Sequence, residues 1–392
     1  MEEHKNCCYE AGCFVTTHND TIIAGSHSYR GLYYSEDKGK TWNQSNINFG
    51  GFGCLNVIGS TVIAGSNSNL GLYYSEDNGK TWNQSNITSG DSYSLTVIGN
   101  TVISGGINSK GLIYSEDNGH TWKESNIDYG DFRCLTIIEN TVIAGSWSNN
   151  GLYYSDDCGK TWKESNIDYG DFHCLAVTNK TVIAGSWSHN GLYYSDDCGK
   201  TWKESNITFG DFWCLTVVGN TVIASSNSNR GLIYSEDKGK TWKYSNITSK
   251  DFRCLTVIGN TVIAGSDDDE GLYYSEDKGY SWYKSNITSG DFRCLTVIGD
   301  IVIASVMVVT GSNSNKGLYY SEDKGKTWKK SNECTIFNKD NTQTIRNRNK
   351  LNSYKKHKNI SQESLFDKID NLYKMCNSIN EKLDEIKKSI GI

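Results

Sequence analysis

One eight-residue pattern, Ser-x-Asp-x-Gly-x-(Thr/Ser)-Trp, occurs eight times in this chain of 392 residues. Seven copies follow one another at intervals of 40 residues, and the eighth begins at Ser321 after a six-residue insertion. The copies start at Ser35, Ser75, Ser115, Ser155, Ser195, Ser235, Ser275 and Ser321. A fixed period of this length indicates one supersecondary unit copied many times, so the fold has to be deduced from the unit and its stacking.

Each repeat contains four short segments of β-forming residues. In the copy that spans residues 251–286, we expect strands at Arg253–Ile258, at Thr261–Ala264, at Gly271–Ser275 and around Trp282. Helical repeats of similar period need two amphipathic stretches of ten or more residues, which the unit lacks. Four short strands joined by tight turns are typical of a propeller blade. The sequence therefore predicts an all-β propeller of about eight four-stranded blades, with seven blades and one atypical terminal unit as the alternative.

The repeated motif has the residues of a tight turn. Its Asp can accept hydrogen bonds from backbone amides of the turn, its Gly supplies a positive φ, and its Trp can pack beneath the turn. We expect these residues to be structural in every copy. The Asp residues are Asp37, Asp77, Asp117, Asp157, Asp197, Asp237, Asp277 and Asp323, and the Trp residues are Trp42, Trp82, Trp122, Trp162, Trp202, Trp242, Trp282 and Trp328.

The segment Ser-Glu-Asp-Lys-Gly-Lys-Thr-Trp resembles the Asp-box, or BNR repeat, of sialidases, of the Vps10 domain of sortilins and of the Ycf48-type photosystem II assembly factor. The resemblance covers about four-fifths of the chain. It implies a propeller in which the box joins the third and fourth strands of each blade, and it implies no particular activity. The absence of Pro and the abundance of Asn, Lys and Ile are also similar to repeat proteins of giant DNA viruses, so a virion or an infected cell is one expected setting.

Sialidases bind the substrate carboxylate through three arginines, one of them in an Arg-Ile-Pro motif, and this chain contains no proline. Arg133, Arg253 and Arg293 share one register of the repeat, which superficially suggests such a triad. A catalytic site is normally built from residues that break a repeat in several different ways, and no isolated acid or nucleophile does so here. We therefore expect a non-enzymatic protein without catalytic residues, with a sialidase-like glycosidase or a glycan-binding propeller as the alternative.

No cofactor or metal site is expected. Cys158 and Cys198 lie in neighbouring motif turns without the further ligands that a zinc site needs. The run Asp267–Glu270 lacks the spacing of a calcium loop, so we interpret it as a solvated acidic loop. His173 and His189 have no evident nucleophile beside them.

Two sets of positions vary between the copies. One is the residue at the start of the predicted first strand, and the other is the loop between the predicted second and third strands. In an up-and-down blade these positions lie on one face, opposite the motif turns. Arg, Trp, Tyr and His are typical of binding hot spots, although neutral drift of loop positions is an open alternative. We expect a recognition surface for a protein or glycan around the central channel, with an exposed stacking surface at its tryptophans. The candidate binding residues are Tyr93, Arg133, Trp147, His173, Trp187, Trp213, Arg253 and Arg293.

Six cysteines occupy one register: Cys54, Cys134, Cys174, Cys214, Cys254 and Cys294. A residue repeated at one strand position is more simply a small buried hydrophobe than half of a disulfide. Residues 1–12 are acidic and polar, without the apolar core of a signal peptide, so we expect an intracellular, cytoplasmic protein. We treat sequons such as Asn206-Ile-Thr as incidental. The formal net charge of −6 gives no reason to expect nucleic acid as a partner, and no apolar run is long enough to span a membrane.

The repeat pattern ends near residue 337. Residues 338–360 are polar and basic and are interpreted as a linker. Residues 361–392 are predicted to form a helix whose apolar positions hold a 4-3 spacing, namely Leu365, Ile369, Leu372, Cys376, Ile379, Leu383, Ile386 and Ile390. That spacing predicts a coiled coil, and hence a homo-oligomer or a partner helix bound along residues 365–390, while docking of the helix on the propeller is the alternative.

Overall fold

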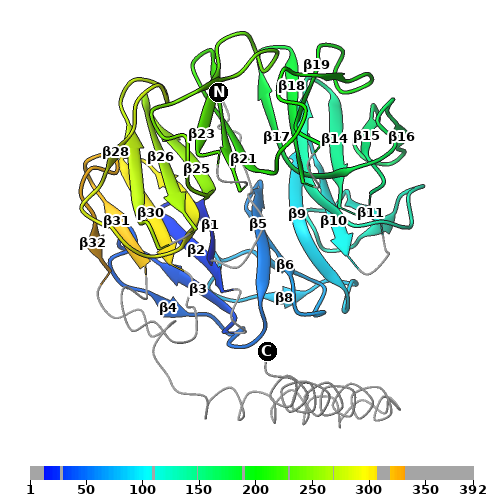
Figure 1. Ribbon diagram of the computed structural model, residues 1–392. Coiled ribbons are helices and arrows are strands. Elements are labelled where there is room, and N and C mark those ends of the chain that lie inside the picture. The colour runs from blue at the N-terminus through cyan, green and yellow to red at the C-terminus, as the bar shows by residue number, and fades with distance from the viewer. Residues whose placement is uncertain are drawn as a thin grey trace, which may run out of the picture. The chain divides into compact units, whose positions relative to one another are not determined.

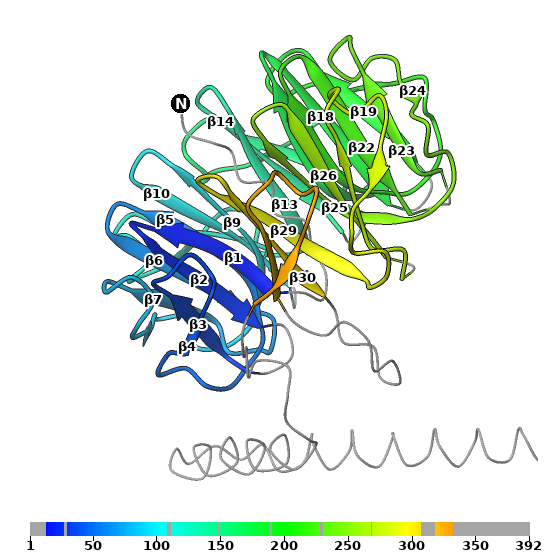
Figure 2. The same cartoon turned by 90° about the vertical axis from the view of Figure 1, so that its left-hand side faces the viewer.

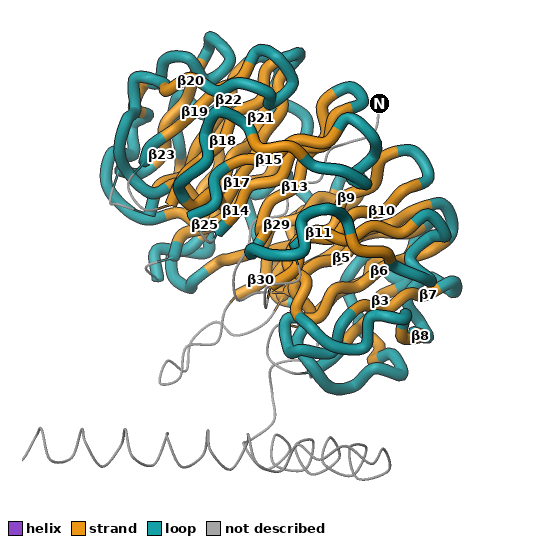
Figure 3. Tube along the Cα trace, turned by 90° about the vertical axis from the view of Figure 1, so that its right-hand side faces the viewer, coloured by secondary structure: helices purple, strands orange, loops and turns teal. Residues whose placement is uncertain are grey.

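The computed structural model describes residues 13–26, 30–107, 111–147, 149–187, 190–227, 230–267, 269–306 and 318–331. All regular secondary structure within these ranges is β-strand (Figure 3). The N-terminal segment 1–12, the linker 338–360 and the predicted helix 361–392 lie outside the described residues.

The strands form eight antiparallel sheets, and each sheet contains four strands that are consecutive in the sequence. The first strand of each sheet is innermost, because the first strands of successive sheets contact one another. These inner strands are β1 (Cys13–His18), β5 (Phe52–Ile58), β9 (Asp91–Ile98), β13 (Phe132–Ile138), β17 (Asp171–Thr178), β21 (Phe212–Val218), β25 (Phe252–Ile258) and β29 (Phe292–Ile298). The second strands are β2 (Thr21–Ser26), β6 (Thr61–Ser66), β10 (Thr101–Ile107), β14 (Thr141–Ser146), β18 (Thr181–Trp187), β22 (Thr221–Ser226), β26 (Thr261–Ser266) and β30 (Ile301–Val306).

The two outer strands of every sheet are shorter. The third strands are β3 (Leu32–Ser35), β7 (Leu72–Ser75), β11 (Leu112–Ser115), β15 (Leu152–Ser155), β19 (Leu192–Ser195), β23 (Leu232–Ser235), β27 (Leu272–Ser275) and β31 (Leu318–Ser321). The fourth are β4 (Asn43–Gln44), β8 (Asn83–Gln84), β12 (Lys123–Glu124), β16 (Lys163–Glu164), β20 (Lys203–Glu204), β24 (Lys243–Tyr244), β28 (Tyr283–Lys284) and β32 (Lys329–Lys330). The sequence-based strands agree with these within about two residues, and the prediction of eight blades is confirmed over the seven-blade alternative.

The blades are arranged around a central axis and close into a ring (Figure 1; Figure 2 shows them from the side). The inner strand β29 of blade eight contacts β1 of blade one. Ile22 and Tyr33 of blade one pack with Ile301, Ile303 and Leu318 of blade eight in one buried cluster. Ring closure therefore uses the same face-to-face packing as the other blade junctions, and each blade is made of one continuous stretch of chain.

The hydrophobic cores lie between neighbouring blades. One of them combines Ile143 and Leu152 of blade four with Phe172, Tyr193 and Trp202 of blade five. A single blade cannot bury its faces alone, because its apolar residues point to both sides of the sheet. Stacking buries them, which is why the repeat must form a ring.

The motif turns behave as predicted. Asp157 Oδ1 accepts hydrogen bonds from the Thr161 amide and the Ser155 hydroxyl at 2.8 Å each, and its Oδ2 accepts from the Thr161 hydroxyl at 2.6 Å. Gly159 has a φ of 81°, and its carbonyl accepts a 2.9 Å hydrogen bond from the buried Trp162 indole. Burial raises the pKa of Asp157, but the hydrogen bonds from Thr161 and Ser155 outweigh it and hold the pKa below its ordinary value.

Neighbouring blades are also joined by a side-chain amide. Asn166 donates to the carbonyl of Trp202 in the next blade at 3.1 Å and accepts from the Trp202 amide at 2.7 Å. The same pair of hydrogen bonds joins Asn206 to Trp242 and Asn246 to Trp282. Asn206 and Asn246 belong to sequons and Asn166 does not, so the recurrence of this asparagine has a structural reason.

The register cysteines are mostly buried hydrophobes, as expected. Cys54, Cys134, Cys174 and Cys254 are buried and form no disulfide, and Cys294 forms no disulfide and is partly exposed. Burial raises the pKa of the Cys134 thiol to about 12. Cys214 is different: it is disulfide-bonded, so the expectation of a free thiol is wrong at this position. The register alone does not distinguish Cys214, although Trp213 before it differs from the residue that precedes each of the other register cysteines.

Candidate functional site

Blades two to eight each carry a β-bulge in the inner strand, and the extra residue is the variable one identified from the repeats. In blade four, Phe132 pairs with Ser146 and Cys134 pairs with Gly145, so Arg133 has no partner residue on β14. The bulge residues are Gly53, Tyr93, Arg133, His173, Trp213, Arg253 and Arg293. A bulge turns a side chain out of the regular alternation of a strand, and bulges are enriched beside functional sites. The sequence showed the variation at these positions but not the bulge.

The bulge residues share one face of the ring with the loops between the second and third strands, as predicted. The amide of Trp147 donates to the carbonyl of Asp131 at 2.7 Å, and the amide of Asp267 donates to that of Asp251 at 3.1 Å. These bonds fix each loop beside the start of its own inner strand. All eight candidate binding residues, together with Asp267, form one continuous set of contacts over blades three to eight, which we call the bulge cluster.

The middle of the bulge cluster is aromatic. The imidazole of His173 is surrounded by three indoles, with ring centroids 4.1 Å from Trp147, 4.7 Å from Trp213 and 5.4 Å from Trp187. Trp187 and Trp213 also contact each other edge to face at 4.4 Å. Edge-to-face pairs at these separations stabilise an aromatic cluster beyond the area that they bury.

Cationic side chains flank the aromatic residues on both sides. The Arg133 guanidinium lies 3.9 Å from the Trp147 ring and 5.5 Å from Tyr93. On the other side, the Arg253 guanidinium lies 4.4 Å from the Trp213 ring. These are cation–π distances, and arginine favours such stacking because its guanidinium is planar and weakly hydrated.

Asp267 links the last two arginines. Its Oδ2 lies 2.5 Å from Arg253 Nε, and its Oδ1 lies 3.3 Å from Arg293 NH2 in the next blade. The three side chains are only 13–14% exposed. One carboxylate therefore connects the arginines of blades seven and eight in a place where solvent screening is weak.

The side chains of the bulge cluster are less exposed than predicted from the sequence. His173 is fully buried and Trp213 is 3% exposed, while Trp147 and Trp187 are half-buried. The prediction of an exposed stacking surface at Trp147 and Trp187 is therefore wrong in part. The bulge residues His173 and Trp213 pack against the two indoles and cover part of them.

His173 is held in the neutral form. Burial lowers the pKa of its imidazole well below the ordinary value, and the positive charges of Arg133 and Arg253 lower it further. Both of its ring nitrogens and the indole nitrogen of Trp213 are buried without a hydrogen-bond partner. Most buried polar groups in proteins are hydrogen-bonded. These three nitrogen atoms therefore distinguish the cluster from an ordinary hydrophobic core.

The other residues singled out in the sequence do not join this site. Glu270 forms ion pairs with Lys250 and Lys284, which lower the pKa of its carboxyl to about 2. With Asp267 paired as well, the acidic run is not the solvated loop that the sequence suggested. The described residues contain no group of His, Cys, Asp and Glu suited to a metal ion. His189 lies outside the described residues.

Three exposed aromatic side chains on the same face were missed by the sequence analysis. Tyr129, Tyr169 and Phe209 are 47%, 50% and 59% exposed, and each lies in the segment that connects one blade to the next. They share one register of the repeat, so comparison of the connecting segments, in addition to the loops, would have found them. They extend the aromatic character of this face outward over blades four to six.

The family model for the BNR/Asp-box repeat matches residues 73–84 and 319–330, which are the motifs of blades two and eight. The other six copies carry the same Ser, Asp, Gly and Trp residues in the same turn. The chain is an eight-bladed propeller of BNR/Asp-box repeats. No curated protein sequence matches it.

Solved structures similar to this Asp-box propeller share its fold at low sequence identity. The computationally designed Ika8 protein has a TM-score of 0.62 at 10% identity, with 76% of this chain and 93% of the other covered. BamB from Moraxella catarrhalis has a TM-score of 0.56 at 16% identity, with 74% and 92% covered. YCF48 bound to D1 peptide has a TM-score of 0.50 at 15% identity, with 72% and 95% covered. Among the described residues of the Asp-box propeller there is no helix that has the length and apolarity of a membrane span.

Proposed function

We propose that this Asp-box propeller is a non-enzymatic binding protein that recognises a protein partner through the bulge cluster and the face around it. The observation that carries the proposal is the convergence of the variable residues of six blades on one contiguous cluster. Residues that drift independently have no reason to meet as matched aromatic, cationic and anionic partners. Trp, Tyr and Arg are also the residue types that dominate the energetics of protein interfaces.

One solved structure of similar fold supports the choice of a protein partner. The YCF48 structure contains a bound D1 peptide, and propeller rings in general offer one face to a partner while the blades stay rigid. The exposed Tyr129, Tyr169 and Phe209 give the present chain an aromatic surface beside its cluster. Replacing both Trp147 and Trp187 by Ala should abolish partner binding while the ring remains folded.

The bulge cluster is poorly suited to glycoside hydrolysis. Hydrolysis of this kind normally needs a pair of carboxyl groups, one of which gives up a proton. Asp267 is the single carboxylate of the cluster, and its two oxygens form ion pairs with Arg253 and Arg293. We therefore expect no hydrolysis of a fluorogenic sialoside by the purified protein, and turnover that exceeds a heat-inactivated control would reject the proposal of a non-enzymatic protein.

A glycan is the second candidate ligand, because Trp147 and Trp187 are half-buried indoles on adjacent blades with centroids 5.9 Å apart. Sugars stack on such rings. A glycan array probed with the full chain and with the Trp147→Ala, Trp187→Ala variant separates the two candidates. Glycan binding by the full chain that the variant loses would show that the ligand is a glycan and not a protein.

We also propose that the chain self-associates through residues 361–392, on the basis of the 4-3 spacing of their apolar residues. Static light scattering of the full chain and of a chain that ends at Asn332 tests this. A higher mass per particle that is lost on truncation is expected. An unchanged state of association would reject the coiled coil.

A further inference from the structure

Blade three lacks two aromatic rings that most other blades contain. In blades two and four to eight, the residue two positions before the register cysteine is a fully buried phenylalanine: Phe52, Phe132, Phe172, Phe212, Phe252 and Phe292. Five of these rings contact a tyrosine of the third strand edge to face, as Phe132 does with Tyr153 at 5.4 Å. Blade three has Ser92 in place of the phenylalanine and Ile113 in place of the tyrosine.

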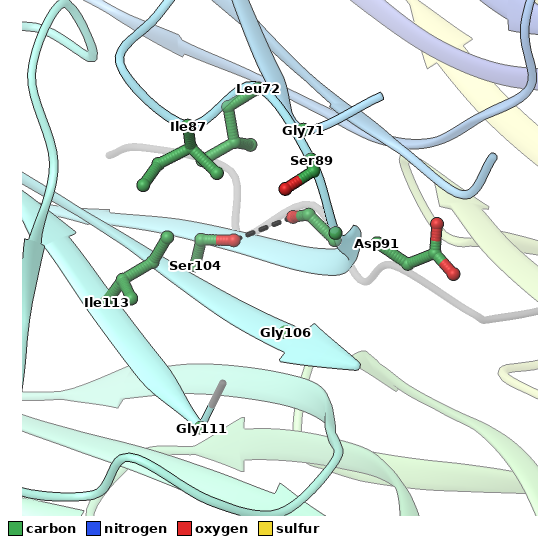
Figure 4. A pocket seen from close by; sticks show the side chains of 11 residues that line it. Gly71, Leu72, Ile87, Ser89, Asp91, Ser104, Gly106, Gly111 and Ile113 are labelled. Carbon is green, nitrogen blue, oxygen red and sulfur yellow. Dashed lines mark hydrogen bonds between the residues drawn. The ribbon is translucent and has the colours of Figure 1, made fainter. Parts of the chain in front are cut away.

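A pocket occupies the place of the missing rings (Figure 4). Leu72 and Ile87 lie on one side of it and Ile113 on the other, with the Ser104 side chain between them. Gly106 also lines it, at a position where β6, β14, β18, β22 and β26 each have a buried serine. Several side chains are therefore smaller at this one place than in the neighbouring blades.

One wall of the pocket is polar. The hydroxyls of Ser92 and Ser104 lie 2.6 Å apart, and Cys54 Sγ lies 3.4 Å from Ser92 Oγ. Ser104 stands where β2, β6, β14, β18, β22, β26 and β30 have an alanine, so the polar pair is particular to blade three. The pocket thus combines apolar walls with one pair of hydroxyls.

The pocket has a volume of about 20 Å³, which is enough for a single water molecule. The replacement of phenylalanine by serine removes a complete ring, so the walls have closed in on part of the vacated space. Its rim includes Ser89, which is exposed, and Asp91, which is partly exposed. Ser89 occupies the register of Tyr129, Tyr169 and Phe209, so no aromatic side chain of that register covers the rim.

We propose that the apolar walls of this pocket in blade three move apart to admit a phenyl or hydroxyphenyl group, which restores from outside the ring that most other blades supply from within. The backbone around the site is that of six blades in which a benzyl side chain fits. Leu72, Ile87 and Ile113 offer the apolar contact that a ring needs, and the Ser92–Ser104 pair can exchange a hydrogen bond with a phenolic hydroxyl. This site is separate from the bulge cluster and does not depend on the proposed function, although Tyr93 of the cluster follows Ser92 directly in the chain.

Methyl NMR of the full chain, titrated with phenol and with N-acetyl-tyrosinamide, tests the proposal. Saturable shifts confined to the methyl groups of Leu72, Ile87 and Ile113 are expected. Stronger binding of N-acetyl-tyrosinamide than of phenol would identify the ring as a polypeptide side chain, and the reverse would identify it as a free small molecule. The absence of a saturable shift with both probes would overturn the proposal and leave a site for water only.

Two variants make the test specific. Ser92→Phe should abolish the shifts and raise the melting temperature, because it fills the pocket with the residue of six other blades. If Ser92→Phe does not fold, Ile113→Tyr takes its place, and it should also abolish the shifts and raise the melting temperature. The matched control is Ile233→Tyr in blade six, where Phe212 is present, and it should leave phenol binding unchanged. Binding that persists in folded Ser92→Phe or Ile113→Tyr protein would also contradict the proposal.

Discussion

The imidazole of His173 lies edge-on to the indole of Trp147, with 4.1 Å between their ring centroids, although the two residues belong to different blades. This contact is part of a set in which a bulge residue of one blade packs against a loop residue of the same or the preceding blade. It shows why the variable residues form a cluster. Each bulge side chain leans toward the axis of the ring, where it meets its neighbours.

His173 should make the stability of the ring sensitive to acid. Its pKa is lowered in the folded state by burial and by Arg133 and Arg253, so only the unfolded chain takes up a proton as the pH falls below about 6.5. Stability should therefore fall by up to about 1.4 kcal/mol for each pH unit below that value. Urea unfolding between pH 7 and pH 5 measures this, and His173→Phe should show a shallower dependence than the wild type. Equal slopes for His173→Phe and wild type would refute the prediction.

Asp267→Asn should destabilise the ring by about 2–4 kcal/mol, because two largely buried guanidinium groups lose a charged partner at once. Chemical denaturation of the variant checks the value. Asp168→Asn changes an exposed aspartate and should stay within about 0.5 kcal/mol of the wild type. Equal effects of the two substitutions would show that the Asp267 ion pairs contribute nothing to folding.

The asparagine amide that joins neighbouring blades should make a measurable contribution to the free energy of unfolding. Asn166→Ala removes both hydrogen bonds to Trp202, which corresponds to about 1–3 kcal/mol of unfolding free energy. Thermal unfolding compares it with Asn220→Ala, a substitution at an exposed turn residue that should have little effect. If Asn220→Ala costs as much as Asn166→Ala, the hydrogen bonds between blades are not a source of stability.

The architecture could be predicted almost completely from the sequence. The turn motif fixes the third and fourth strands of each blade, since the Asp157 carboxylate and the Trp162 indole make their hydrogen bonds within the turn and Gly159 supplies its positive φ. Because such local interactions repeat eight times, the sequence predicted directly the strand order within a blade and the loops that share the face opposite the motif turns. Even the eighth blade, with its insertion, obeys the same pattern.

The candidate site was predicted as a set of residues but not as a structure. Which residue of an inner strand is extra depends on pairing with the second strand, and the run Phe132-Arg133-Cys134 does not reveal it. The burial of His173 follows from that bulge and was therefore missed. Asp267 was assigned to an acidic loop, because its two arginine partners lie in separate positions of the sequence and only the ring brings them together.

Partner capture from the native source is the most direct test of the bulge cluster as a recognition site. Wild-type protein, a folded Trp147→Ala, Trp187→Ala variant, and a Lys200→Ala, Lys240→Ala variant on the opposite face are compared by quantitative mass spectrometry. We predict that the wild type and the lysine variant retain the same partner and that the tryptophan variant loses it. A partner that the tryptophan variant retains at the wild-type level, or that only the lysine variant loses, would contradict recognition through the bulge cluster.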